Sequence, residues 1–207
     1  MIVAELMTRG PVTVLPSDKL ELAYEKMKTG RFRQVPVLNE GKLIGILTDR
    51  DVRQYLEQLS RTRVDAAMTA VPISVGPSTT VEKAAHLLVT NKIGSLPVVD
   101  NGKLVGIITA SDMLHALEAI LGSTADGSVR IDLDVTGSGE ISAAIDLIRT
   151  VCPVQYMGTY NRKPPKEGQV LYVRVAGSGA EHAASLLGRY GFKVLTVHHE
   201  SDLRVTS

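Results

Sequence analysis

The feature that most constrains the fold is an internal repeat. The phrase GILTDRD begins at Gly45, and GIITASD, with the same pattern, begins at Gly106, 61 positions later. The same offset, without gaps, aligns further pairs: Met7-Thr8 with Met68-Thr69, Pro11 with Pro72, Pro16-Ser17 with Pro77-Ser78, Pro36-Val37 with Pro97-Val98, and Gly41-Lys42-Leu43 with Gly102-Lys103-Leu104. A gapless repeat of this kind indicates one supersecondary unit built twice.

Each copy predicts the same order of elements: strand, helix, strand, turn, strand, helix. A short strand is expected over residues 12–14, and again over 73–75. The helix that follows opens with Asp18-x-x-Glu21 or Thr79-x-x-Glu82, and both patterns fit a capping box. Next, VPVLNEGKLIGIL and LPVVDNGKLVGII each place two apolar, β-rich runs around a turn, which predicts a hairpin. The last helix begins at the Thr-x-x-Asp of the phrase.

These repeats resemble the cystathionine-β-synthase (CBS) domain, which usually occurs as a tandem pair called a Bateman module. Both copies carry the family's initial Met-Thr, its Pro-Val strand and its Gly-x-x-Thr-x-x-Asp phrase. We expect the first repeat over residues 1–60 and the second over 61–121. The resemblance implies a pseudo-two-fold disc with two clefts that bind adenosine-containing ligands.

The chemistry of the phrase can also be argued from its residues. Its first glycine lets the backbone pass close to a ligand or a neighbouring segment. Thr48 and Thr109 are expected at a helix N-terminus, where free N–H groups and the helix dipole favour phosphate. Asp51 and Asp112 follow within the first turn, and a carboxylate can accept both hydroxyls of a ribose. The alternative is that Thr-x-x-Asp is only a capping box that closes the helix start.

The two copies differ in their basic residues. Arg31 and Arg33 precede Pro36, whereas the second copy has Lys92 and then Gly94 before its proline. In related domains a basic residue three positions before the proline often reaches phosphate, and arginine suits phosphate through bidentate hydrogen bonds. Solvated surface charge is the alternative for each arginine. We expect clefts of unequal affinity, with Arg33 on the phosphate side.

The expected nucleotide-binding residues come from both copies. Adenine needs an apolar slot, for which Val12, Ile73, Val35 and Leu96 are candidates, although ordinary core packing explains these four equally well. The full set is Val12, Thr13, Arg33, Val35, Pro36, Thr48, Asp51, Ile73, Ser74, Ser95, Leu96, Pro97, Thr109 and Asp112. AMP, ADP, ATP, S-adenosylmethionine and NAD share the same adenosine, so the sequence does not choose among them.

A second repeat follows the first pair. GSTADGS, residues 122–128, is small and polar and predicts a linker. IDLDVTGSGE from Ile131 then matches LYVRVAGSGA from Leu171, 40 positions later. Each half predicts a strand, a Gly-Ser-Gly turn, an Ala-rich helix and another strand. Two such halves joined by YNRKPPKEG, whose Pro164 and Pro165 keep it irregular, give a ferredoxin-like βαββαβ sandwich over residues 129–207. The expected fold is therefore mixed α/β and α+β.

This C-terminal half resembles ACT domains, small regulatory modules that often bind amino acids, chiefly in its architecture. Family members often carry Asp-x-Pro-Gly or an Asn-rich loop after the first strand, where this chain has Thr136, Gly137, Ser138 and Gly139. The helix N-terminus at this loop could hold a carboxylate, but a tight strand-to-helix turn is the favoured interpretation. The order CBS, CBS, ACT is similar to the acetoin-utilisation protein B-like group, which implies a regulatory role.

Composition excludes several classes of protein. A formal net charge of +1 gives no reason to expect nucleic acid or an anionic membrane as a partner. No apolar run approaches the roughly 18 residues of a membrane span, and the N-terminus lacks the basic region of a signal peptide. Cys152 is alone, so no intrachain disulfide can form. These features predict a soluble, cytoplasmic protein.

Catalytic and metal-binding patterns are not evident. His198 and His199 are expected on opposite faces of a strand, and His86, His115 and His182 lack a second ligand at metal spacing. Cys152 is best explained as a buried structural thiol. We therefore expect no enzyme and no required cofactor. Two hypotheses remain: a sensor of adenosine-containing ligands that signals to an unidentified partner protein, or a non-sensing assembly module. In either case a homodimer is expected by analogy.

Overall fold

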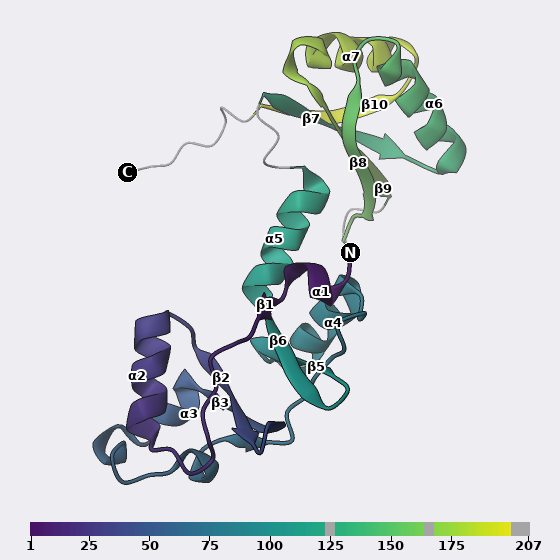
Figure 1. Cartoon of the computed structure of the whole chain (residues 1–207). Helices are drawn as coiled ribbons and strands as arrows, with labels where there is room; N and C mark the ends of the chain where they lie inside the picture. The colour runs from purple at the N-terminus through teal and green to yellow at the C-terminus, as the bar shows by residue number, and fades with distance from the viewer. Residues whose placement is uncertain (123–126, 164–167, 200–207) are drawn as a thin grey trace. The chain divides into compact units, whose positions relative to one another are not determined.

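The computed structural model describes residues 1–122, 127–163 and 168–199, and the chain divides into two units at Ala116/Leu117 (Figure 1). Most of the predicted linker, residues 123–126, lies outside the described residues, as do Pro164 and Pro165 of the predicted irregular connection. No helix in the described ranges is long and apolar enough to cross a membrane.

Both repeats contribute a helix, a hairpin and a second helix to the first unit. In the first repeat these are α2 (Leu20–Gly30), β2 (Gln34–Asn39), β3 (Lys42–Thr48) and α3 (Asp49–Arg53), and in the second they are α4 (Val81–Asn91), β5 (Ser95–Asp100), β6 (Lys103–Thr109) and α5 (Ala110–Leu121). Shorter elements are α1 (Val3–Leu6), β1 (Thr8–Arg9), η1 (Leu56–Gln58), η2 (Val64–Ala66) and β4 (Thr69–Ala70).

The two predicted hairpins are confirmed. β2 pairs antiparallel with β3, and β5 pairs antiparallel with β6. Their two-residue turns have positive φ at both positions, 49° and 77° at Glu40 and Gly41, and 48° and 78° at Asn101 and Gly102. This geometry is the type I′ turn, whose twist matches that of antiparallel strands.

The two repeats exchange their N-terminal segments. β1 pairs with β6 of the second repeat, and β4 pairs with β3 of the first, so the two sheets have the orders β1-β6-β5 and β2-β3-β4 (Figure 1). Val3 and Met7 accordingly lie in the core of the second repeat, and Val64 lies in the core of the first. A Cβ atom at Gly106 would collide with the sulfur of Met7, as one at Gly45 would with Met68. The close neighbour of each phrase glycine is therefore a methionine of the other copy, not a ligand.

The predicted strands over 12–14 and 73–75 are wrong in extent. Each is reduced to one bridging residue, Val14 beside Val37 and Val75 beside Val98, both parallel. The Val14 N–H donates to the Pro36 carbonyl at 3.2 Å, and the Val14 carbonyl accepts from Leu38 at 2.9 Å. Prolines before and after each segment remove N–H donors, which limits the pairing to the central residue.

The predicted capping boxes at the first helix of each repeat are also wrong. Helix α2 has Lys19 as its N-cap, without a side-chain cap, because the Asp18 carboxylate accepts from the backbone of Leu15 at 2.8 Å instead. Helix α4 is capped by Thr80 and not by Thr79, and the Thr80 hydroxyl accepts a backbone N–H three residues later at 3.3 Å. Both helices therefore begin one residue later than predicted.

The second unit is one antiparallel sheet with two helices on one face. Its elements are β7 (Ser128–Val135), α6 (Ser138–Arg149), β8 (Val154–Asn161), β9 (Gln169–Ala176), α7 (Gly177–Arg189) and β10 (Lys193–His199). The strand order β10-β7-β9-β8 gives the ferredoxin-like βαββαβ arrangement.

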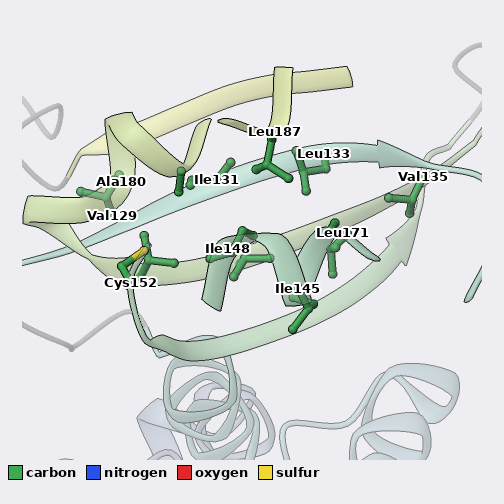
Figure 2. Packing of buried hydrophobic residues seen from close by; sticks show 14 residues of the cluster. Val129, Ile131, Leu133, Val135, Ile145, Ile148, Cys152, Leu171, Ala180 and Leu187 are labelled. Atoms are coloured by element: carbon green, nitrogen blue, oxygen red, sulfur yellow. The ribbon is translucent and has the colours of Figure 1, made fainter. Parts of the chain in front are cut away.

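The core of the second unit follows from strand alternation. Every second residue of β7, from Val129 to Val135, points to the helices, as do Leu171, Val173 and Val175 of β9. These side chains pack against Ile145 and Ile148 of α6 and Ala180 and Leu187 of α7 (Figure 2). Cys152 lies in the same cluster, 7% exposed, so the prediction of a buried thiol is confirmed (Figure 2).

Candidate functional site

A cleft of about 720 Å³ lies in the first unit. Its walls combine the N-terminal segment from Thr8 to Val12, residues 30–36 of the first repeat, and the second repeat's Gly94, Ser95 and Ile107–Ser111 region. Ligand pockets typically measure about 300–1,000 Å³, so the cleft has room for a nucleotide.

The charge of the cleft is positive. Arg31 and Arg33 line it, and none of its lining residues is acidic. Both arginines are exposed, and neither guanidinium forms an ion pair with any residue that the structure describes. Two unpaired guanidinium groups without a neighbouring carboxylate attract an anionic ligand.

Ser95 contributes an unpaired hydroxyl to the cleft wall. The residue is 3% exposed, and within the described parts of the chain its Oγ atom has no hydrogen-bond partner. Its neighbour Leu96 is fully buried in the core, so alternation along β5 places Ser95 on the opposite face. A buried hydroxyl without a partner costs about 1–3 kcal/mol, and a polar ligand atom in the cleft would remove that cost.

The capping interpretation of Thr-x-x-Asp is confirmed in both repeats. One carboxylate oxygen of Asp112, Oδ2, accepts from the Thr109 backbone at 2.7 Å and from its hydroxyl at 2.8 Å. Asp51 and Thr48 repeat the arrangement at 2.9 and 2.7 Å. For neither aspartate does the other oxygen, Oδ1, have a hydrogen bond to a described residue. Capping therefore leaves one oxygen of each carboxylate available.

The N-terminus of α5 borders the cleft through Thr109, Ala110 and Ser111. The Ala110 N–H donates to the Gly94 carbonyl at 3.0 Å, and the Asp112 N–H donates to the Thr109 hydroxyl at 3.4 Å. The Ser111 N–H is left at the open end of this 12-residue helix. The helix end can therefore offer one backbone donor and its dipole to an anion.

The structure brings together only part of the predicted nucleotide-binding set. Val12, Arg33, Pro36, Ser95 and Thr109 line the cleft. Val12 is 47% exposed, as expected of an apolar cleft wall, whereas Val35 and Leu96 are fully buried in the two cores. Those two are core residues, so the packing alternative holds for them. The remaining predicted residues are not among the lining residues: Thr13, Thr48, Asp51, Ile73, Ser74, Pro97 and Asp112.

Several lining residues were not predicted. They are Thr8, Gly10, Pro11, Arg31, Gln34, Gly94, Ile107, Ala110 and Ser111, with Gly30 and Phe32 at the end of α2. The cleft takes its arginines from one repeat and its phrase residues from the other, a combination that the sequence did not predict. Gly94 is the residue of the second repeat that aligns with Arg33. A Cβ atom at Gly94 would collide with the Gln34 amide, so the glycine makes room for the Gln34 side chain.

The Thr136–Gly139 loop is the tight turn that the sequence favoured. Gly137 is the N-cap of α6 in extended conformation. The Glu140 carboxylate accepts from the Thr136 backbone at 2.7 Å and from its hydroxyl at 2.8 Å. The helix's own carboxylate thus takes up both donors of Thr136 at the start of this loop.

Metal and nucleophile candidates are accounted for by other contacts. His199 lies 3.0 Å from a Glu181 oxygen, and His198 lies 2.8 Å from the Thr196 hydroxyl, so the two histidines have separate partners. Within the described ranges there is no cluster of three potential metal ligands. Burial raises the pKa of the Cys152 thiol, which disfavours the reactive thiolate.

The cleft is lined by both copies of one repeated unit, each with a helix, a hairpin and a second helix. This arrangement is that of a tandem-repeat ligand-binding module. The CBS domain family model matches residues 3–58 and 64–119, which together exceed half of the chain. The chain therefore belongs to the CBS domain family, and its first unit is a tandem CBS pair.

Two curated relatives show how far the similarity extends. The chain is 31% identical over 136 residues to a CBS domain-containing protein of Dictyostelium discoideum, covering 58% of this chain and 94% of that protein. It is 38% identical over 108 residues to inosine-5′-monophosphate dehydrogenase of Korarchaeum cryptofilum, covering 52% of this chain and 22% of the enzyme. The chain thus spans less than a quarter of the enzyme's length, and this similarity concerns the CBS region alone.

Solved structures share the fold of the CBS pair. A putative acetoin utilization protein (AcuB) of Vibrio cholerae has a TM-score of 0.55 and 33% identity, covering 61% of this chain and 96% of that one. CBSX2 of Arabidopsis thaliana in complex with AMP has a TM-score of 0.51 and 32% identity, covering 57% and 97%. The CBS pair of protein MJ0100, in complex with 5′-methylthioadenosine and S-adenosyl-L-methionine, has a TM-score of 0.54 and 25% identity, covering 57% and 97%. Similar CBS pairs therefore bind adenosine-containing ligands.

Proposed function

We propose that the CBS pair senses a phosphorylated adenosine ligand, such as AMP, ADP or ATP, in the cleft and passes its binding state to a partner protein. The observation that carries the proposal is the unsatisfied chemistry of the cleft. Two unpaired arginines and one buried, unpaired serine hydroxyl line a cavity of nucleotide size. The AMP complex of CBSX2 supports the same ligand class.

Charge favours a nucleotide over the other adenosine ligands. 5′-Methylthioadenosine carries no phosphate, and S-adenosylmethionine carries a sulfonium and an ammonium against a single carboxylate, so its net charge is positive. 5′-Methylthioadenosine would give Arg31 and Arg33 no anionic partner, and the two arginines would repel S-adenosylmethionine. A phosphate, in contrast, accepts bidentate hydrogen bonds from a guanidinium and a further one from the Ser111 N–H. S-adenosylmethionine is thus the weaker candidate among the ligands expected from the sequence.

The rest of the nucleotide would meet the apolar and hydroxyl-bearing walls. Val12 and Pro11 provide an apolar surface for adenine, and the Ser95 hydroxyl provides a polar contact within it. Thr109 lies at the edge where the ribose would follow, with Asp112 one helical turn away. The free Oδ1 atom of Asp112 is the acceptor that a ribose hydroxyl requires.

Signalling requires that the ligand bind two states of the protein with different affinity. The partner protein, the cytoplasmic location and the absence of a required cofactor stay predictions. A non-sensing, homodimeric assembly module is the second candidate. It is favoured by the capping boxes, because these account for Thr-x-x-Asp in both repeats without any ligand.

The ACT-like identity of the second unit stays a prediction that rests on its βαββαβ arrangement. An amino-acid ligand that used the Thr136 N–H or hydroxyl would have to displace Glu140 from its two hydrogen bonds. We therefore place the sensing function in the CBS pair and assign no ligand to the second unit.

Thermal unfolding with a ligand panel tests the proposal. A ligand at a hundred times its dissociation constant adds about 2.7 kcal/mol, which raises the melting temperature of a chain this size by roughly 5–10 °C. We expect this shift with AMP, ADP or ATP, and a smaller one with adenosine, 5′-methylthioadenosine or S-adenosylmethionine. Inorganic phosphate serves as the control for non-specific anion binding. No shift with any adenosine ligand would leave the assembly module as the function.

A further inference from the structure

Arg31 of the cleft has a backbone conformation that arginine disfavours. It ends helix α2 with φ at 54° and ψ at 35°, in the left-handed region. Helices usually place glycine at such an end, because glycine has no Cβ atom to be strained. The neighbouring Gly30 serves another purpose, since a Cβ atom there would collide with the Phe32 ring. Strained residues of this kind cluster at binding sites, where the surrounding structure maintains them.

A single phosphate does not use all the donors of the cleft. Arg31 and Arg33 both line it, and neither guanidinium has an ion-pair partner in the part of the chain that the structure describes. A phosphate monoester has three terminal oxygens. One guanidinium takes two of them in a bidentate pair, and the Ser111 N–H takes the third. AMP therefore satisfies one arginine and leaves the other without a phosphate of its own.

Contacts along the cleft wall give the order of its positive groups. The Ala110 N–H at the start of α5 donates to the Gly94 carbonyl at 3.0 Å. Gly94 lies against the Gln34 amide. Arg33 directly precedes Gln34, and Arg31 is two residues further from this contact, at the end of α2. Arg33 therefore follows the α5 N-terminus along the wall, and Arg31 follows Arg33.

We propose that Arg31 binds the second phosphate of a nucleoside di- or triphosphate, so that the cleft selects ADP and ATP over AMP. This inference rests on the proposed nucleotide function of the cleft. A phosphate at the α5 N-terminus and Arg33 continues in ADP and ATP into a second phosphate, which supplies the oxygens that Arg31 lacks with AMP. The cleft volume of about 720 Å³ lies in the upper half of the range typical of ligand pockets, so the phosphate chain has room.

The alternative role for Arg31 is stabilisation of the helix end, because a cation near a helix C-terminus interacts favourably with the dipole. Lys92 provides the matched case. It ends α4 at the equivalent position of the second repeat, with φ at 54° and ψ at 40°, and it is not among the residues that line the cleft. A purely helical role would make the two positions behave alike.

Calorimetric titration of the full chain with adenosine, AMP, ADP and ATP tests the proposal, in magnesium-free buffer so that no metal ion neutralises the phosphates. Three variants accompany the wild type. Arg31→Gly removes the cation and the backbone strain, and Arg31→Gln removes the cation alone. Lys92→Gly makes the matched change outside the cleft. Melting temperatures within roughly 4 °C of the wild type show that each variant is folded.

We expect the wild type to bind ADP and ATP about tenfold more tightly than AMP, because a charge-assisted hydrogen bond to a further phosphate contributes about this factor. Both Arg31 variants should lose this preference and keep the wild-type affinity for AMP. Lys92→Gly should keep the preference.

Two kinds of result would overturn the role of Arg31 while the proposed function stands. One is a wild type that binds AMP more tightly than adenosine but binds ADP and ATP no more tightly than AMP. The other is a preference for ADP and ATP that persists in both Arg31 variants or is lost equally in Lys92→Gly. Equal affinity for all four ligands, or binding of none, would overturn the proposed function together with this inference.

Discussion

In the cleft a polar residue is buried and an apolar residue is exposed, because Ser95 is 3% exposed and Val12 is 47% exposed. A fold optimised for packing alone would pair the hydroxyl and bury the valine. Both residues line the same cleft. A ligand with a polar group and an apolar ring would resolve both conflicts at once, which is the residue-level basis for the sensing proposal.

Ser95→Ala separates ligand binding from folding. Removing the unpaired hydroxyl should leave the free energy of unfolding unchanged or raise it by about 1 kcal/mol, because a buried, unsatisfied group disappears. Affinity for AMP should fall several-fold, since a contact is lost. Chemical denaturation and calorimetric titration measure the two effects. A destabilised variant with unchanged AMP affinity would mean that the hydroxyl has a structural partner.

Val71 adopts a backbone conformation that its side chain disfavours. Its φ is 52°, in the left-handed region, and it is 89% exposed. The equivalent residue of the first repeat is Gly10, at 55°. Val71→Gly should raise stability by about 0.5–1 kcal/mol, or roughly 1–4 °C in melting temperature, because glycine adopts this region without strain.

Gly10→Val is the matched reverse substitution. A Cβ atom at Gly10 meets no atom within 4 Å, so any loss comes from the backbone conformation alone. It should lower the melting temperature by a similar amount. Equal melting temperatures for Val71→Gly and the wild type would show that this conformation costs nothing at Val71.

At the scale of elements, the helix starts α3 and α5 have the same capping box but different surroundings. Thr109, Ala110 and Ser111 line the cleft, and no residue of Thr48–Asp51 does. Asp51→Ala and Asp112→Ala should each lower stability by about 1 kcal/mol, because each removes the carboxylate half of a capping box. Only Asp112→Ala should also weaken the stabilisation by AMP. Thermal unfolding with and without AMP compares the two, and equal effects on AMP binding would remove the ribose role from Asp112.

The exchange of N-terminal segments determines how the whole first unit is stabilised. Met7 belongs to the first repeat in sequence but is 8% exposed in the core of the second. Met7→Ala should therefore cost about 2–4 kcal/mol and should raise hydrogen exchange in β5 and β6 before β2 and β3. Met68→Ala should show the reverse pattern. If each substitution instead raised hydrogen exchange first in the methionine's own repeat, the exchange of N-terminal segments between the repeats would be contradicted.

Much of this architecture could be predicted from the sequence. The offsets of 61 and 40 residues predicted both hairpins of the CBS pair and the βαββαβ order of the second unit. The Thr-x-x-Asp caps followed from local spacing, because capping involves residues of one helical turn. The helix start at Lys19 did not follow, since an upstream turn takes the Asp18 carboxylate. In the second repeat, two adjacent threonines offered a cap, and the hydroxyl of Thr80 is the one that accepts the N–H.

The composition of the cleft was the part that sequence could not supply. The sequence did not predict β1 and β4 as strands, and a repeat with two equivalent copies does not state which copy completes which sheet. Arg33 was expected on the phosphate side of a cleft, and the structure places it in a cleft lined by Thr109 and Ser111 of the other repeat.

The phosphate-sensing cleft is tested most directly by measuring how much the phosphate contributes to binding. Calorimetric titration of AMP and adenosine on the wild type should show AMP bound about 10–100-fold more tightly, because charge-assisted hydrogen bonds contribute roughly 1.5–3 kcal/mol. In Arg33→Gln this ratio should fall about tenfold. In Arg50→Gln, an exposed arginine outside the cleft lining, the ratio should stay as in the wild type. Equal affinity of the wild type for AMP and adenosine, or an Arg33→Gln ratio unchanged from the wild type, would contradict a phosphate-sensing cleft.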